Sequence, residues 1–308
     1  MRTAFIKTLE SLAEKNKDIF LIVGDLGFGV TTNFAEKYPE QYLNSGIAEQ
    51  NMTGVAAGLA MSGKTVLTYS IANFPTIRPL EQIRNDVCYH NANVKIVAVG
   101  GGFCYGALGP THFATEDLAI MRALPNIVVL APGDPWEAKA ATEAMITYKG
   151  PVYLRLGRAG EPNVHKSPVN YQIGKSITVK EGNDITILCI GGTLYNSLQA
   201  SEILERKGIS VRLISMGSLK PLDTDAILKA AKETNNIFTV EEHSLIGGLG
   251  SAVSEIICES RIPVKLKKLG VTSEFPDRVG NQEWFLKKYK LDSDGIVETI
   301  LQTLKNKQ

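Results

Sequence analysis

The sequence predicts an α/β protein with two domains, each a mostly parallel sheet flanked by helices. Short uninterrupted apolar runs, such as 19–23 and 94–99, are typical of strands that are buried on both faces. Segments with helical patterns separate these runs, and alternating strands and helices indicate parallel sheets. A polar stretch at 160–168 interrupts the alternation, and 308 residues are enough for two domains. We expect a first domain at 1–160, a linker at 161–180 and a second domain at 181–308.

Each element of the first domain follows from a local pattern. Residues 1–14 place Phe5, Ile6, Leu9 and Leu12 on one face of an amphipathic helix. The apolar run 19–23 ends in Gly-Asp-Leu, which is typical of a buried strand that leads into a functional loop. Further strands are expected at 65–69, 94–99, 127–130 and 152–155, and further helices from Arg78, Glu116 and Pro135.

The second domain repeats the alternation. Its strands are expected at 185–190, 211–214, 237–240 and 264–269, and its helices begin near Asn196, Thr224, Gly250 and Asp292. Between the third strand and the third helix, Glu241, Glu242 and His243 precede the glycine cluster 247–250. A glycine cluster alone is weak evidence for a phosphate-binding loop. We interpret this segment as a strand-to-helix turn at an interface.

Composition narrows the class of protein. The chain is 44% hydrophobic and 21% charged, with a formal net charge of +1. This balance argues against nucleic acid as a partner, because such partners select basic surfaces. No apolar run approaches the 18 residues that a membrane span needs. The four cysteines lie in or beside apolar runs without a CxxC pair, so we expect buried, reduced thiols in a cytoplasmic protein.

One stretch, 44–61, stands out. Glu49 follows a glycine-containing turn, and after it apolar residues recur at helical spacing among the small residues of Ala56-Ala-Gly-Leu-Ala60. A carboxylate that enters such a tight helix is costly to bury ionised, so it needs a partner or a proton. The bland alternative is an acid that stabilises the N-terminus of a helix.

The wording Gly46-Ile-Ala-Glu-Gln50, followed by Ala-Ala-Gly-Leu-Ala, resembles the cofactor-activating segment of thiamine-diphosphate enzymes of the transketolase superfamily. The resemblance covers nearly the whole chain: 1–160 is similar to the family's pyrimidine-binding domain and 181–308 to its C-terminal domain. It implies that Glu49 hydrogen-bonds N1′ of the cofactor's aminopyrimidine and thereby activates the cofactor.

The same resemblance assigns further cofactor contacts. Asp25 and Leu26, at the end of the first strand, match an Asp-Leu that lies beside the thiazolium and the substrate. Phe74 matches the aromatic residue that stacks on the pyrimidine. A turn-forming aspartate and one more core aromatic residue are the structural alternatives for Asp25 and Phe74.

Substrate contacts are also implied. Gly109-Pro-Thr-His112 resembles a transketolase segment whose histidine contacts substrate hydroxyls, and a histidine can also relay protons. Arg2 and Arg158 match arginines that hold the substrate phosphate, for which arginine is well suited. Two positions depart from the family: Leu108 replaces an acidic residue that reads the acceptor's hydroxyl, and Gly29 replaces a phosphate-contacting serine, which Thr31 or Thr32 could substitute.

Half of a cofactor site is missing from the sequence. The family grips the diphosphate through magnesium with Gly-Asp-Gly and a later asparagine, on a separate domain. Gly24-Asp-Leu26 lies 25 residues before Asn51, but the same loop already belongs to the Glu49 segment. We therefore expect no metal ligands in this chain. We expect a separately encoded N-terminal subunit that binds the diphosphate and magnesium, in an α2β2 assembly.

The resemblance predicts a transferase subunit that moves a two-carbon ketol unit between sugars or sugar phosphates. One alternative is decarboxylative acyl transfer, as in deoxyxylulose phosphate synthase or the beta subunit of 2-oxo-acid dehydrogenases. Another is a non-catalytic scaffold subunit. The joint presence of Glu49, Phe74 and His112 argues against the scaffold, which needs none of them.

Overall fold

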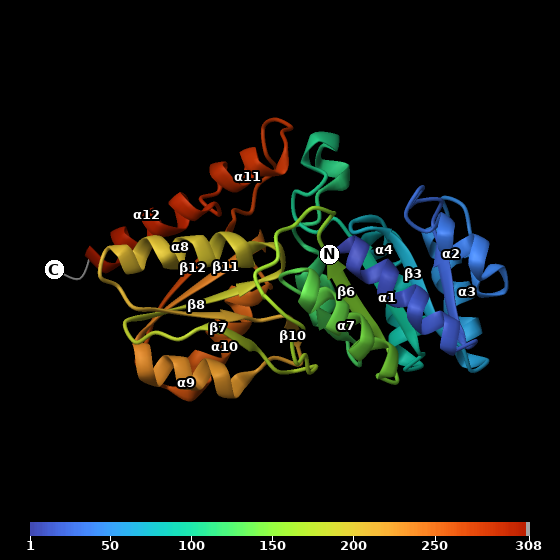
Figure 1. The fold of residues 1–308 in the computed structure, drawn as a ribbon, viewed down its shortest axis with the longest axis horizontal. Helices are drawn as coiled ribbons and strands as arrows, with labels where there is room; N and C mark the ends of the chain where they lie inside the picture. The colour runs from blue at the N-terminus through green and yellow to red at the C-terminus, as the bar shows by residue number, and fades with distance from the viewer. Residues whose placement is uncertain (306–308) are drawn as a thin grey trace.

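Two sheets of seven and five strands organise the chain, of which the computed structural model describes residues 1–305 (Figure 1). The first sheet has the order β10-β5-β6-β4-β3-β1-β2, and its strands are parallel except β10. The second has the order β12-β11-β8-β9-β7 and is parallel except β7. The predicted fold class is confirmed. The strands are β1 (Ile19–Val23), β2 (Tyr42–Asn44), β3 (Thr65–Ile71), β4 (Val94–Val99), β5 (Val128–Leu130), β6 (Val152–Leu156), β7 (Ile177–Lys180), β8 (Ile185–Ile190), β9 (Val211–Ser215), β10 (Ser218–Lys220), β11 (Asn236–Ser244) and β12 (Lys265–Val271).

Helices cover both faces of the first sheet. On one face α1 (Arg2–Lys15) and α7 (Pro135–Thr147) bury Phe5, Leu9 and Met145 against the strands. On the other face lie α3 (Glu49–Met61), the π-helix Ile83–Tyr89 and α6 (Asp117–Ala123). The strands β3, β4 and β6 are buried on both faces, which explains their uninterrupted apolar runs.

The second sheet is also covered on both faces. One core joins α8 (Leu194–Arg206) and α12 (Ser293–Lys305) to the sheet and includes Phe103 and Phe113 of the first domain. The other contains α9 (Thr224–Thr234) and α10 (Leu249–Ser260) and continues into the first domain. Both cores therefore bind the two domains together.

Several short elements were not predicted, because three to seven residues carry little periodicity. They are α2 (Thr32–Lys37), α11 (Gln282–Lys288) and the strands β2, β7 and β10. The strand β10 belongs to the second half of the chain but completes the sheet of the first. The helix expected from Arg78 begins earlier, at Phe74, as α4 (Phe74–Ile77). The next helix, α5 (Leu80–Gln82), starts after Pro79.

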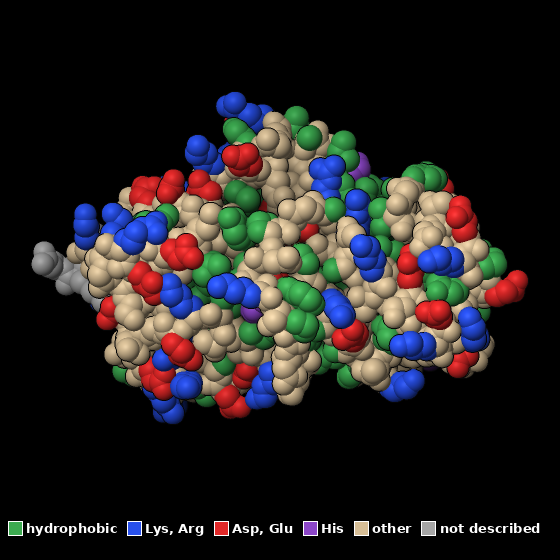
Figure 2. Space-filling view, viewed as in Figure 1, with side chains coloured by type: hydrophobic (Ala, Val, Ile, Leu, Met, Phe, Trp, Pro, Cys, Tyr) green, Lys and Arg blue, Asp and Glu red, His purple; other side chains and the backbone are tan. Residues whose placement is uncertain are grey.

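The surface and the cysteines agree only partly with expectation. Figure 2 shows acidic and basic side chains interspersed over one face, in keeping with the small net charge. Among residues 1–305, no helix has the length and apolar character of a membrane span. Cys88 and Cys189 are buried, and Cys104 is partly buried. The prediction is wrong for Cys258, which is exposed on α10.

A glycine run, 100–102, lets the domains approach closely. A Cβ on Gly101 would overlap the Arg155 side chain, and a Cβ on Gly102 would overlap that of Glu242. Buried Arg155 forms an ion pair with Asp117 at 2.9 Å and donates to the carbonyl oxygens of Ala114 and Glu242. The Glu242 carboxylate accepts from the Phe103 amide at 2.7 Å, and burial raises the pKa of Glu242 to about 7.

Gly102→Ala is expected to destabilise the fold by about 2–4 kcal/mol, because a left-handed backbone strains alanine and overpacking adds to the strain. The φ angle of Gly102 is +66°. Gly208→Ala is the matched control, since Gly208 has φ +82° but open space around its Cβ position. Urea unfolding of both variants measures the difference, and equal losses would show that the contact with Glu242 contributes nothing.

Candidate active site

Glu49 is the first residue of α3, and its side chain is only 3% exposed. Its Oε1 accepts a hydrogen bond from Arg78 Nη1 at 2.8 Å, so the buried carboxylate has a cationic partner. The pair lines a cavity of about 520 Å³ together with Ile47, Ala48, Gln50 and Asn51. The sequence required such a partner but did not identify Arg78.

Asn44 fixes the turn before Glu49 to the end of β1. Its Oδ1 accepts from the amides of Asp25 and Gly46, and its Nδ2 donates to Asp25 Oδ1 at 3.0 Å. Both Asp25 and Gly46 have positive φ angles, +53° and +71°. Asp25 is therefore a turn residue, as the structural alternative held, and it also lies beside the Glu49 segment. Leu26 follows it and is partly exposed.

Phe74 and His112 lie on either side of one contact. Their ring centroids are 5.0 Å apart in an edge-to-face arrangement, and Arg78 Cζ lies 4.0 Å from the Phe74 centroid. The neighbouring loops are joined by a hydrogen bond from Asn73 Nδ2 to the Thr111 carbonyl oxygen. Partial burial, with the nearby Arg78 charge, lowers the pKa of His112. The structure thus links Glu49, Phe74 and His112 through Arg78.

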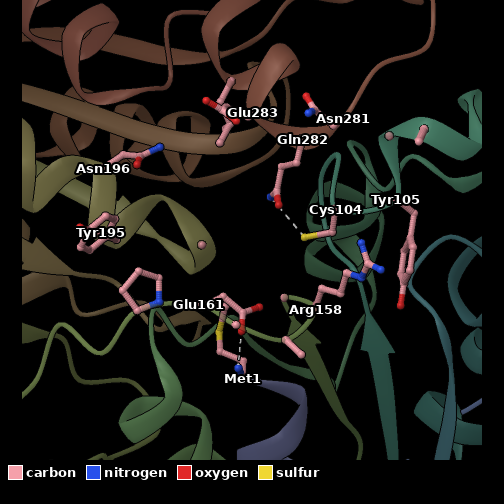
Figure 3. Close-up of a pocket in the computed structure, with 18 of the residues that line it drawn as sticks. Met1, Cys104, Tyr105, Arg158, Glu161, Tyr195, Asn196, Asn281, Gln282 and Glu283 are labelled. Carbon is pink, nitrogen blue, oxygen red and sulfur yellow. Dashed lines mark hydrogen bonds and ion pairs between the residues drawn. The ribbon is translucent and has the colours of Figure 1, made fainter. Parts of the chain in front are cut away.

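Arg2 and Arg158 form a second group. The Arg2 amide donates to the Arg158 carbonyl oxygen, and Arg2 Nε is buried without a partner among residues 1–305. Arg158 Cζ lies 5.6 Å from the ring centroid of Tyr105. Figure 3 shows Arg158 and Tyr105 beside a cavity of about 700 Å³, opposite Tyr195, Asn196 and Gln282 of the second domain.

The loop after β1 connects the two groups. Tyr69 is buried on β3, and a Cβ on Gly27 would lie 3.1 Å from its ring. Burial raises the pKa of Tyr69, while the charge of Arg2 opposes that rise. The loop therefore reaches the arginine group through Gly27 and Tyr69, and its Asp25 is bonded to the Glu49 segment. The carboxyl ends of β1 and β3 supply both groups, as expected for a ligand site in an open α/β sheet.

Arg78, Tyr69 and Tyr105 were missed by the sequence reasoning. Arg78 is four residues after Phe74, a spacing that places two side chains on one helical face, so this signal was available. Tyr69 is near the carboxyl end of a predicted strand, where ligand-binding residues gather. Tyr105 had no local signal. Its ring lies where a Cβ on Gly100 would be, so only the folded backbone reveals it.

The two departures from the family lie on the surface of this region. Gly29 has φ +72°, and its amide donates to Thr32 Oγ1 at 3.2 Å. Thr31 is buried and donates to the Gly27 carbonyl oxygen, so its hydroxyl is engaged within the loop. Leu108 is 56% exposed and lines the 700 Å³ cavity.

The segment Glu241-Glu242-His243 is a strand-to-helix turn at the domain interface, as expected. Both Glu241 carboxylate oxygens accept from amides at the start of α10, those of Leu249 and Gly250, at 2.7 Å each. The helix N-terminus that would bind a phosphate is thus already capped. His243 Nε2 accepts from the Ala119 amide of the first domain, and burial lowers the pKa of His243 to about 4.

Within residues 1–305, one cluster has metal-ligating side chains close enough for a metal ion: Asp134, Glu137 and His165. Glu137 pairs with His165 at 2.9 Å and accepts from the Gly133 amide and the Ser215 hydroxyl. Asp134 caps α7 and accepts from the amides of Val164 and His165. These oxygens are occupied by protein donors, so the cluster holds the segment after β6 in place.

The residues present fit one half of thiamine diphosphate. A buried carboxylate that faces a cavity beside an aromatic ring suits a flat aminopyrimidine, which donates hydrogen bonds and stacks. A magnesium diphosphate needs unengaged oxygen ligands with octahedral geometry. The described residues gather carboxylates only in the Asp134 cluster, whose oxygens are engaged. The fit therefore extends to the pyrimidine end.

Comparisons with known proteins agree with this division. Residues 1–161 match the family model "Transketolase, pyrimidine binding domain", and residues 174–296 match "Transketolase, C-terminal domain". One of the separately encoded subunits of the apulose-4-phosphate transketolase of Phocaeicola vulgatus is 41% identical over 306 residues, covering 99% of this chain and 97% of the relative. A putative transketolase C-terminal section of Methanocaldococcus jannaschii is 40% identical over 308 residues, covering 99% of this chain and 96% of the relative.

A solved structure described as a split-gene transketolase, an inactive beta4 tetramer, superimposes with a TM-score of 0.89 at 39% identity. It covers 100% of this chain and 98% of that one. The similarity thus extends over both domains and over the whole length of separately encoded relatives. The chain belongs to the transketolase family, and it corresponds to the C-terminal subunit of a split transketolase.

Proposed function

We propose that this chain is the catalytic C-terminal subunit of a thiamine-diphosphate-dependent transketolase that moves a two-carbon ketol unit between sugars or sugar phosphates. The observation that carries the proposal is the buried Glu49 carboxylate, joined through Arg78 to Phe74 and His112. A scaffold subunit would gain nothing from a buried charge at a cavity, since burying it is costly.

Each residue has a role in this proposal. When bound, the cofactor supplies the carbon nucleophile that carries the ketol unit. Glu49 hydrogen-bonds N1′ of the aminopyrimidine and exchanges a proton there, while Phe74 stacks on that ring. Asp25 and Leu26, at the end of β1, border the reacting centre.

The substrate is held by a separate set of side chains. The lowered pKa of His112 keeps its ring neutral at pH 7, so it can both donate to and accept from sugar hydroxyls. Arg2 and Arg158 hold the phosphate of a phosphorylated sugar. The unpartnered Arg2 Nε supports this role, because a buried donor without an acceptor is costly unless a ligand completes it.

A partner subunit supplies the diphosphate and magnesium site in this proposal. The outer face of α3 supports it: Ile47 is 75% exposed, Met61 is 60% exposed, and Cβ atoms on Gly54 and Gly58 would meet nothing within 4 Å. Glycine within a helix costs about 1 kcal/mol relative to alanine, and nothing within the described part of this chain requires it there. A helix of the N-terminal subunit packed closely on this face would require it, in an α2β2 assembly.

The substrate class is tested by assaying the chain together with its N-terminal partner. Ketol transfer from a ketose phosphate to an aldose is the expected activity. A pair that instead consumes a 2-oxo acid with release of carbon dioxide would establish decarboxylative acyl transfer and overturn the proposal. The replacement of an acid by Leu108 favours acceptors that lack the usual hydroxyl beside the aldehyde.

His112→Ala is expected to lower kcat by about 10²-fold or more while changing the affinity for thiamine diphosphate little, because His112 contacts substrate in this proposal. His90→Ala is the control, since His90 is exposed next to the π-helix. Steady-state kinetics and calorimetric titration of the cofactor separate the two effects. A large loss of cofactor affinity with unchanged kcat would place His112 in the cofactor site instead.

A further inference from the structure

Arg78 makes two contacts of the kind that the proposed function assigns to the cofactor's aminopyrimidine. Its guanidinium donates to Glu49 Oε1 at 2.8 Å, and the same group lies over the Phe74 ring at 4.0 Å. A guanidinium is flat, carries N–H donors at its edge and stacks on aromatic faces, as an aminopyrimidine does. One carboxylate oxygen and one ring face cannot serve both groups together.

We propose that Arg78 is a built-in placeholder for the aminopyrimidine, which neutralises Glu49 and covers Phe74 until the cofactor displaces it. This inference rests on the proposed function, since it takes Glu49 and Phe74 as the pyrimidine contacts. It adds a residue and an exchange step that the transketolase resemblance did not supply.

The burial of the pair explains why a placeholder is useful. Glu49 is 3% exposed, and a buried carboxylate without a partner is strongly destabilising. Arg78 removes that penalty whenever the pyrimidine is not in place. The stack on Phe74 adds a cation–π contact, which keeps the guanidinium over the ring.

The position of Arg78 explains how it can leave. Its side chain is 44% exposed, and the residue sits between α4 and α5, immediately before Pro79. A rotation of the side chain into solvent frees the carboxylate and the ring face without moving a helix. The displaced guanidinium regains water, so the exchange costs little beyond the ion pair and the stack.

The exchange also reaches His112. The Phe74 ring contacts His112 edge-on, and the Arg78 charge is one of the two causes that lower the pKa of His112. Departure of the guanidinium removes that charge from the substrate-binding histidine. Cofactor binding is in this way coupled to the electrostatics of the neighbouring substrate site.

The test uses 4-amino-5-hydroxymethyl-2-methylpyrimidine, the cofactor's ring without its diphosphate, titrated into the isolated chain by NMR and calorimetry. Arg78→Ala is expected to bind this probe about tenfold more tightly than the unmodified chain, since a half-exposed ion pair and a cation–π contact no longer compete. Arg78→Lys, which keeps the charge without the flat fork, is expected to fall between them.

Arg84→Ala is the matched control, because Arg84 is exposed on the following helix and its guanidinium bonds only Asn85 among residues 1–305. Its affinity for the probe is expected to stay unchanged. Free guanidinium, at a non-denaturing concentration with sodium chloride as the ionic-strength control, is expected to weaken probe binding in Arg78→Ala more than in the unmodified chain.

Weaker or unchanged probe affinity in Arg78→Ala would overturn the inference, because it would make Arg78 a co-ligand or a bystander. Absence of any binding to this variant overturns it equally. Failure of the proposed function shows differently: the pair of subunits would then lack ketol transfer whatever residue stands at 78. Circular dichroism of each variant verifies that the fold is retained.

Discussion

Glu49→Gln is expected to lower turnover of the enzyme, assembled with its N-terminal partner, by about 10²–10⁴-fold. An amide keeps the size of the side chain and one hydrogen-bond acceptor, but it cannot take up or release a proton at N1′. The neutral side chain also needs no cationic partner, so the turn at 44–48 and the start of α3 are expected to persist. Only the activation of the cofactor is removed.

Three measurements isolate that effect. Single-turnover kinetics with saturating cofactor give the rate loss, size-exclusion chromatography shows whether the subunits still associate, and circular dichroism shows whether the fold is kept. Glu81→Gln is the control, because Glu81 is exposed on α5 and belongs to the same region of the fold. A Glu49→Gln enzyme that turns over near the unmodified rate would remove Glu49 from the catalytic site.

The second large effect concerns the chain alone, which is expected to bind thiamine diphosphate at millimolar affinity or weaker. A charge-assisted hydrogen bond contributes about 1.5–3 kcal/mol and an aromatic stack about 0.5–1.5 kcal/mol. Their sum is near the roughly 4 kcal/mol that corresponds to a 1 mM dissociation constant. Arg78 lowers this further, because it competes for both contacts. Calorimetric titration with magnesium present measures the affinity, and micromolar binding would contradict the account.

The sequence predicted the sheets well, because their strands are buried on both faces and an uninterrupted apolar run is the direct signature of that environment. The runs at 19–23, 94–99 and 185–190 became β1, β4 and β8 with the same bounds. The strand β10 could not be predicted in this way. Three residues carry no period, and its pairing with β5 depends on how two domains meet.

The candidate site shows the same boundary between local and tertiary information. Glu49 was found because a carboxylate beside small apolar residues conflicts with its surroundings, and that conflict is visible in the sequence. The choice of Arg78 as its partner was not predicted, since any of several cations could have fulfilled it. The glycine run at 100–102 was visible, but only the folded chain shows Arg155 and Glu242 against it.

The cysteines illustrate a misleading local signal. Cys258 follows Ile256 and Ile257 in an apolar run, which favoured burial. In α10 the buried positions are Leu249, Gly250, Ala252, Val253 and Ile257, so the neighbouring Cys258 turns outward. The helical period, rather than the local composition, decides which side chain is buried.

The central claim is that this chain holds the pyrimidine half of the site and is inactive by itself. The most direct measurement is a ketol-transfer assay of the purified chain with thiamine diphosphate and magnesium, before and after addition of the separately purified N-terminal subunit. We expect no turnover from the chain alone and full turnover from the mixture. Turnover by the isolated chain would contradict the account, because the described residues supply no ligands for the magnesium diphosphate.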